Sequence, residues 1–145
     1  MTNTKNHDIF ISITVETILK GVHMNKLDKK YMEIIESWIH ESKQQQIFLE
    51  NDDRLDEANL EKIRCNIYEI FQQMFQQSKK TTKTEEDFIQ RYLSYHQNIP
   101  ANWKRSHEQA KEQNSIDMFI EETKIEAATK VEQLFRSLWC KDGLN

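Results

Sequence analysis

Glycine and proline are almost absent from this chain, which has two glycines and one proline in 145 residues. Turns in all-β and doubly wound α/β folds depend on these residues, because glycine reaches positive φ and proline fixes φ. Three such residues cannot supply the turns of a sheet protein of this length. Glycine-rich phosphate-binding loops are excluded for the same reason. We therefore predict an all-α protein.

The predicted architecture is a single helical-bundle domain covering residues 1–145, with residues 1–7 disordered. A chain of this length removes about 70% of its unfolded surface from water without needing a metal or a disulfide. Short connections between amphipathic helices favour antiparallel neighbours, and hence an up-and-down bundle with a core of Ile, Leu and Phe. Apolar spacing predicts four main helices at about 28–50, 56–78, 85–97 and 116–140, with short helical pieces at about 8–20 and 101–113.

Individual residues set several of these boundaries. Residues 9–15 alternate as a strand would, but Gly21 offers a C-terminal cap and favours helix for this segment. Asp56 is the expected N-cap of the third segment, and Thr84 opens the next one as the start of a capping box. Pro100 biases the residue before it away from helix, so we place a helix boundary there.

The charge of the chain is acidic overall, with a formal net charge of −4 and a pI near 5.8. Residues 31–62 contain nine acidic side chains against three basic ones. This composition argues against nucleic-acid binding of the usual basic kind. Arg91, Lys104 and Arg105 do interleave with aromatic residues, as in proteins that stack single-stranded bases. Nucleic-acid binding is therefore only the third hypothesis, because acidic residues flank these three charges.

Cysteine usage and the lack of long apolar runs predict a cytoplasmic protein. Cys65 and Cys140 lie far apart with no metal-ligand spacing near either, which favours a reduced compartment. No stretch approaches the roughly 20 apolar residues that a membrane-spanning helix needs, and no signal peptide is recognisable. We expect Cys65 on the outer side of its helix, as an inert thiol.

Two acidic pairs resemble the ExxE and ExxD pattern of the all-α nucleotide pyrophosphohydrolases, namely Glu33 with Glu36 and Asp53 with Asp56. That resemblance implies magnesium held between helices, with His40 nearby. On a helical wheel, however, Glu33, Glu36 and His40 lie opposite the apolar arc of their helix and are expected to face solvent. We therefore predict no metal site and no cofactor.

His96 suggests an alternative function because it shares a helix face with Tyr92. A pocket between helices, lined by Trp38, Tyr92, His96 and Trp103, would suit a helical ligand-binding protein or a metal-dependent enzyme. The other interpretation is a partly buried His96 whose ring nitrogens bond to a backbone carbonyl or a tyrosine hydroxyl.

The leading hypothesis is a non-enzymatic bundle that binds a protein partner of unknown identity, as a small cytoplasmic regulator, adaptor or inhibitor. Met118 and Ile125 are seven residues apart on the face opposite the core stripe of the last helix, with Ala128 and Trp139 to one side. Phe10 lies on a second apolar side of the first segment. Such strips meet a partner, a second copy in a homodimer, or another helix of the same chain.

Overall fold

The computed structural model describes residues 24–113 and 117–140. These ranges contain four helices and no strand, which confirms the all-α prediction. The predictions for residues 1–7, residues 9–15 and Phe10 lie outside the described residues. The helices are α2 (Lys26–Asn51), α3 (Leu55–Thr81), α4 (Glu85–Glu112) and α5 (Asp117–Trp139).

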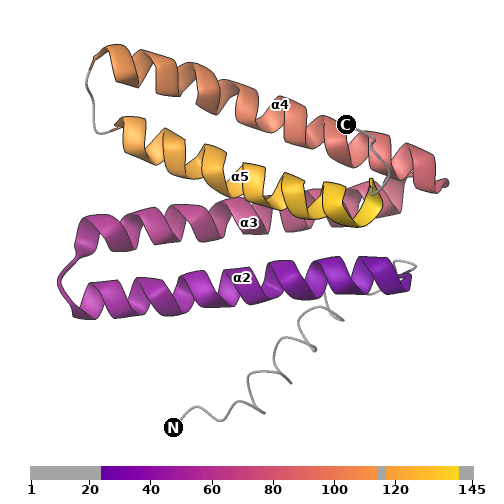
Figure 1. The fold of residues 1–145 in the computed structure, drawn as a ribbon, viewed down its shortest axis with the longest axis horizontal. Coiled ribbons are helices and arrows are strands. Elements are labelled where there is room, and N and C mark those ends of the chain that lie inside the picture. Colours follow the sequence, from indigo (N-terminus) through magenta and orange to yellow (C-terminus); the bar gives the residue numbers. More distant parts are fainter. Residues whose placement is uncertain (1–23, 114–116, 141–145) are drawn as a thin grey trace, which may run out of the picture.

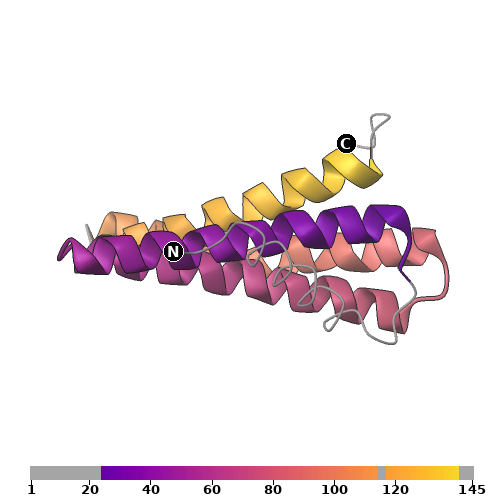
Figure 2. The same cartoon turned by 90° about the horizontal axis from the view of Figure 1, so that it is seen from below.

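The helices form two hairpins that pack on each other. α2 packs against α3, α4 packs against α5, and α3 also contacts both helices of the second hairpin. The C-terminal ends of α2 and α4 lie at the same end of the bundle as the N-terminal ends of α3 and α5 (Figure 1). Figure 2 shows α5 inclined to the other three helices. This arrangement is the up-and-down bundle expected from short connections.

Side-chain caps begin two of the helices. Thr84 Oγ1 accepts a hydrogen bond from Asp87 N at 3.1 Å, which confirms Thr84 as the N-cap of α4. α2 begins at a capping box, which was not predicted from the sequence. Asn25 Oδ1 accepts from Asp28 N at 2.8 Å, and the Asp28 carboxylate accepts from Asn25 N at 3.1 Å. Each cap satisfies N–H groups that have no partner within the helix.

The start of α3 differs from the prediction, because Asp56 is not its N-cap. The N-cap is Arg54, which makes no side-chain capping bond and pairs instead with Glu57. The tight turn from α2 passes through Asp53, which has a positive φ of 59°. Aspartate tolerates this conformation better than most residues. Asp56 thus lies inside the first turn, where its carboxylate favours the positive end of the helix dipole.

α4 continues through Pro100, so the predicted boundary there is wrong, and 85–97 and 101–113 belong to one helix. Proline removes one backbone hydrogen bond and its ring crowds the preceding turn, at a cost of about 3 kcal/mol in a helix interior. Packing on both sides of Pro100 outweighs this cost. His96 is buried one turn before it, and Ala110 is buried further along the same helix.

The core is more aromatic than the predicted set of Ile, Leu and Phe. Tyr31, Tyr68 and Tyr92 are among its most deeply buried side chains. The hydroxyls of Tyr31 and Tyr92 hydrogen-bond to each other, which satisfies two polar atoms inside the core. Phe135 packs edge-to-face against both of these rings, and Trp139 packs in the same way against Tyr31, as aromatic pairs prefer.

Candidate functional site

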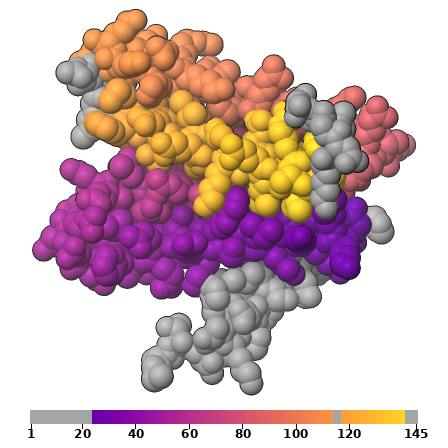
Figure 3. Space-filling view, in the orientation of Figure 1, coloured from indigo at the N-terminus to yellow at the C-terminus, as the bar shows by residue number. Residues whose placement is uncertain are grey.

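A groove of about 430 Å³ lies between α2, α3 and α5. Trp38 on α2 and Tyr68 on α3 line it, with ring centroids 5.6 Å apart and planes at 50°. Figure 3 shows α2 and α5 in space-filling form, in the orientation of Figure 1. Tyr68 is almost fully buried and forms the floor, whereas Trp38 is half-buried. Burial raises the pKa of Tyr68 to about 12, so this ring is an uncharged phenol at neutral pH.

The ammonium group of Lys130 lies against the rings of Trp38 and Tyr68. The Nζ of Lys130, from α5, lies 4.1 Å from the Trp38 ring centroid and 5.6 Å from that of Tyr68. Both distances are within the range of a cation–π contact. Lys130 itself is exposed, so its stem covers the groove without being fixed by surrounding protein. The two rings therefore form a surface on which a positive charge is stabilised.

Glutamates surround this surface. Glu41, Glu61 and Glu126 line the groove together with two basic residues, Arg64 and Lys130. Glu61 forms an ion pair with Arg64 on the same helix, so these two charges neutralise each other. Among the remaining charged side chains, Glu41 and Glu126 are negative and only Lys130 is positive, so the groove carries an excess of negative charge.

His96 is buried, with 4% of its surface exposed, and stacks on Phe71 at a centroid distance of 4.1 Å. Tyr92 meets it edge-on at 4.7 Å. Neither ring nitrogen has a hydrogen-bond partner, so the expected bond to a carbonyl or a tyrosine hydroxyl is wrong. The Tyr92 hydroxyl instead bonds to Tyr31. Burial, with a smaller effect of Arg136, lowers the pKa of His96 to about 3.

The four residues of the predicted pocket occupy different environments. Tyr92 and His96 touch each other inside the core, but Trp38 lines the groove on the other hairpin. Trp103 lies two helical turns beyond His96, with the ammonium of Lys124 6.0 Å from its ring centroid. The burial of Tyr92 and His96 also removes both rings from any surface on which nucleic-acid bases would stack.

The outward apolar strip predicted for α5 is only partly present. Met118 and Ile125 are half-buried. Ala128 and Trp139, predicted to lie to one side of them, contact the core and do not extend the strip. Ala128 is buried, and the Trp139 ring stacks on Phe135 at 4.5 Å within the bundle. The inclination of α5 brings its last turn over the aromatic core, which a helical wheel of α5 alone does not reveal.

Two other residues expected to face outward are buried. Glu36 is 7% exposed and accepts a hydrogen bond from Gln72 Nε2 at 2.7 Å. Cys65 is buried, and its Sγ donates to Glu69 Oε1 at 3.2 Å. Burial and this hydrogen bond raise the pKa of Cys65 to about 12, so its thiol stays protonated at neutral pH. Across residues 24–113 and 117–140, no three His, Cys, Asp or Glu side chains are placed to hold a metal ion.

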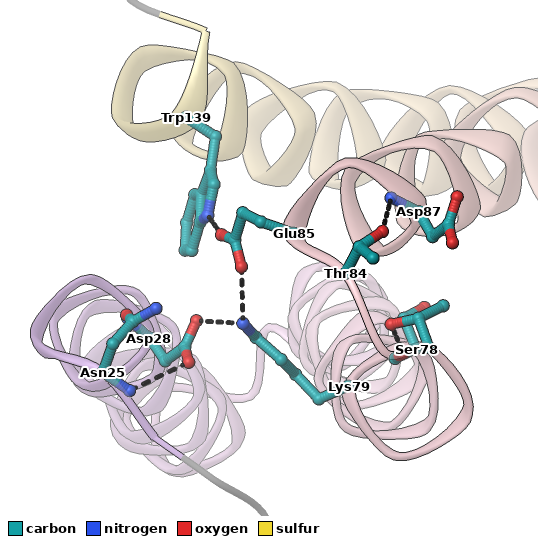
Figure 4. A network of polar contacts seen from close by, with 9 residues as sticks. Asn25, Asp28, Ser78, Lys79, Thr84, Glu85, Asp87 and Trp139 are labelled. Atoms are coloured by element: carbon teal, nitrogen blue, oxygen red, sulfur yellow. Dashed lines mark hydrogen bonds and ion pairs between the residues drawn. The ribbon is translucent and has the colours of Figure 1, made fainter.

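A polar network joins all four helices at the end of the bundle opposite the α2–α3 connection (Figure 4). Lys79 Nζ lies 2.9 Å from the Asp28 carboxylate and 3.4 Å from that of Glu85. Trp139 Nε1 donates to the other oxygen of Glu85 at 2.8 Å. Asp28 is only 1% exposed, so Lys79 neutralises a charge that has almost no contact with water. We assign this network to stability, because each charge already has a partner within the chain.

No described helix is both long enough and apolar enough to cross a lipid bilayer. No family model matches the chain, and neither a curated protein nor a solved structure is detectably similar to it.

Proposed function

We propose that this protein is a non-enzymatic helical bundle that binds a protein partner, as a small cytoplasmic regulator, adaptor or inhibitor. The groove between α2, α3 and α5 is the observation that carries this proposal. It combines a half-buried tryptophan, Trp38, with a rim of charged side chains. Tryptophan, tyrosine and arginine supply most of the binding energy in protein interfaces, usually inside a polar rim.

The reactive side chains support binding over catalysis. A nucleophilic cysteine needs a thiolate, but the Cys65 thiol is buried and its pKa is raised to about 12. A general base needs a pKa near the working pH, whereas the pKa of His96 is lowered to about 3. A reducing cytoplasm also suits Cys65 and Cys140, which both carry free thiols.

Site-specific crosslinking tests the proposal. A photoreactive amino acid in place of Gln45, an exposed residue on the groove, should crosslink a partner in cells of the native host. Reversing two exposed rim charges with Glu41→Lys and Glu126→Lys should abolish the product. The matched control, Glu86→Lys with Glu112→Lys, makes the same change of charge on α4, outside the groove. Crosslinking that survives the groove substitutions but not the control would place partner binding elsewhere and contradict the proposal.

A homodimer is a second proposal, supported by a different surface. Ile47, Phe48, Leu55 and Phe119 are large apolar side chains, each more than half exposed. The first three flank the α2–α3 connection, and Phe119 lies in the first turn of α5 at the same end of the bundle (Figure 1). Clustered exposed apolar groups mark association surfaces. Sedimentation analysis should detect a dimer, and Phe48→Glu should convert it to a monomer. The control Gln44→Glu, at another exposed position of α2, should leave the dimer intact. A wild-type protein that is monomeric at every concentration would contradict the homodimer proposal.

A further inference from the structure

We infer that the occupant of the groove is a basic peptide segment, one arginine of which replaces Lys130 on the rings of Trp38 and Tyr68. This inference rests on the proposed function and names the chemistry of the partner. Lys130 then acts as an internal competitor, which holds the site in the absence of the partner.

The aromatic pair formed by Trp38 and Tyr68 already holds a positive charge. Lys130 Nζ is 4.1 Å from the Trp38 centroid, close enough for the ring quadrupole to attract it. An arginine guanidinium has the same charge, but it is planar and more weakly hydrated, so it stacks on an aromatic face better than an ammonium does. The half-buried position of Trp38 leaves part of this ring accessible.

The Lys130 side chain can leave the two rings without a change of fold. It is an exposed residue on a flexible four-carbon stem, so a change of rotamer is enough to move its ammonium off the rings. Glu126 lies one helical turn earlier on α5, and a glutamate four residues before a lysine is the favourable order for an ion pair on a helix. A displaced Lys130 therefore has a second partner available.

The charges around the groove are complementary to those of a basic segment. Arg64 is committed to Glu61, so it offers little attraction to an acidic partner. Glu41 remains at the rim to receive the incoming cation. The surrounding part of the chain, residues 31–62, has nine acidic residues against three basic ones, which favours the approach of a basic segment.

The test uses a defined probe, the peptide acetyl-Ala-Arg-Ala-amide, and the indole N–H signals of the three tryptophans in a ¹H–¹⁵N NMR titration of the full chain. Trp38→Phe assigns the Trp38 signal. We expect a saturable shift of that signal, while the signals of Trp103 and Trp139 stay in place. The same peptide with citrulline, which has nearly the shape of arginine but no charge, should produce no saturable shift.

Removing the ammonium group of Lys130 tests directly whether this group competes with the arginine peptide. Lys130→Gln should tighten binding of the arginine peptide about two- to fivefold, the factor expected for loss of one competing cation–π contact at an exposed site. Lys124→Gln is the matched control, since Lys124 is also on α5 and lies 6.0 Å from a different ring, that of Trp103. This control should leave the affinity unchanged. Both substitutions are away from the buried core, so loss of folding does not confuse the outcome.

The inference is overturned if the citrulline peptide binds equally well, if Lys130→Gln weakens or does not alter binding, or if the arginine peptide gives no saturable shift. Its failure is distinguishable from failure of the proposed function. A partner that crosslinks through Gln45 in a groove-dependent way, but without any preference for arginine, refutes only the chemistry inferred here. Arginine binding at Trp38 without groove-dependent crosslinking refutes the proposed protein partner instead.

Discussion

Replacing His96 by phenylalanine should make the bundle more stable in acid relative to the wild type. The imidazole is 4% exposed, and neither nitrogen has a hydrogen-bond partner. Phenylalanine keeps the stacking on Phe71 and the edge contact with Tyr92 that the imidazole makes. The substitution therefore removes the titrating group while retaining an aromatic ring of similar shape.

The size of the effect follows from the two pKa values of His96. Burial lowers its pKa in the folded protein to about 3, whereas the ordinary value of 6.5 applies after unfolding. Below pH 6.5 the unfolded chain binds a proton that the folded chain does not, so stability falls as the pH decreases toward 3. Linkage gives a loss of about 2 kcal/mol at pH 5 relative to neutral pH, from 1.36 kcal/mol for each pKa unit.

Urea unfolding between pH 7.5 and pH 5 measures this loss directly. The stability of the wild type should fall over this range by about 2 kcal/mol more than that of His96→Phe. At pH 7.5 the variant should already be more stable by about 1 to 3 kcal/mol, because it no longer buries unpaired polar nitrogens. Asn98→Gln, an exposed substitution on α4 that involves no titrating group, serves as the control and should retain the wild-type slope. Parallel curves for the wild type and His96→Phe would refute the argument.

Three further predictions concern Lys79, Pro100 and Cys65. Lys79→Met should lower the free energy of unfolding, measured in urea, by about 3 to 5 kcal/mol, because it leaves buried Asp28 without its ion pair. Adding Asp28→Asn should recover part of this loss. A loss below about 1 kcal/mol would contradict this account. Pro100→Ala should raise the free energy of unfolding in urea by about 2 kcal/mol, because a restored helix hydrogen bond outweighs the lost burial of the proline ring. A variant less stable than the wild type would instead show that the packing of the ring dominates. Cys65 should react with a thiol reagent at pH 8 far more slowly than Cys140, because Cys65 is buried and its pKa is raised to about 12. Unfolding the chain in urea should remove this difference. Equal reaction rates in the folded protein would show that Cys65 is not buried.

Local chemistry made part of the fold predictable. The cap at Thr84 depends on residues within one helical turn, and its prediction was confirmed. Pro100 could not be placed correctly in the same way, because the local preference to end the helix is opposed by contacts with α5, which is distant in sequence. The helix wheel failed for Glu36 and Cys65 for a related reason. α2, which carries Glu36, packs against both α3 and α5, and α3, which carries Cys65, contacts all three other helices, so the buried arc of each helix is wider than its apolar stripe.

The candidate site was less predictable than the fold. Trp38 stood out as an aromatic residue on an amphipathic helix, and the structure places it at the groove. Neither Tyr68 nor Lys130 was predicted to belong to a site, because in the sequence Lys130 is an ordinary lysine of an amphipathic helix and Tyr68 has no motif around it. Their juxtaposition depends on how three helices are rotated about their own axes, and the spacing of residues within one helix does not specify those rotations.

The network around Lys79 also determines where the bundle can open. Lys79 belongs to the α2–α3 hairpin, whereas Glu85 and Trp139 belong to the α4–α5 hairpin, so the network fastens one hairpin to the other at a single end. The groove is built by both hairpins, and the opposite end presents exposed apolar side chains. We therefore expect a hinge motion in which the two hairpins move apart at the end that carries the exposed apolar side chains, while they stay in contact at the end that carries the network. Native-state amide exchange should be slowest near Lys79 and become faster along α3 toward Leu55.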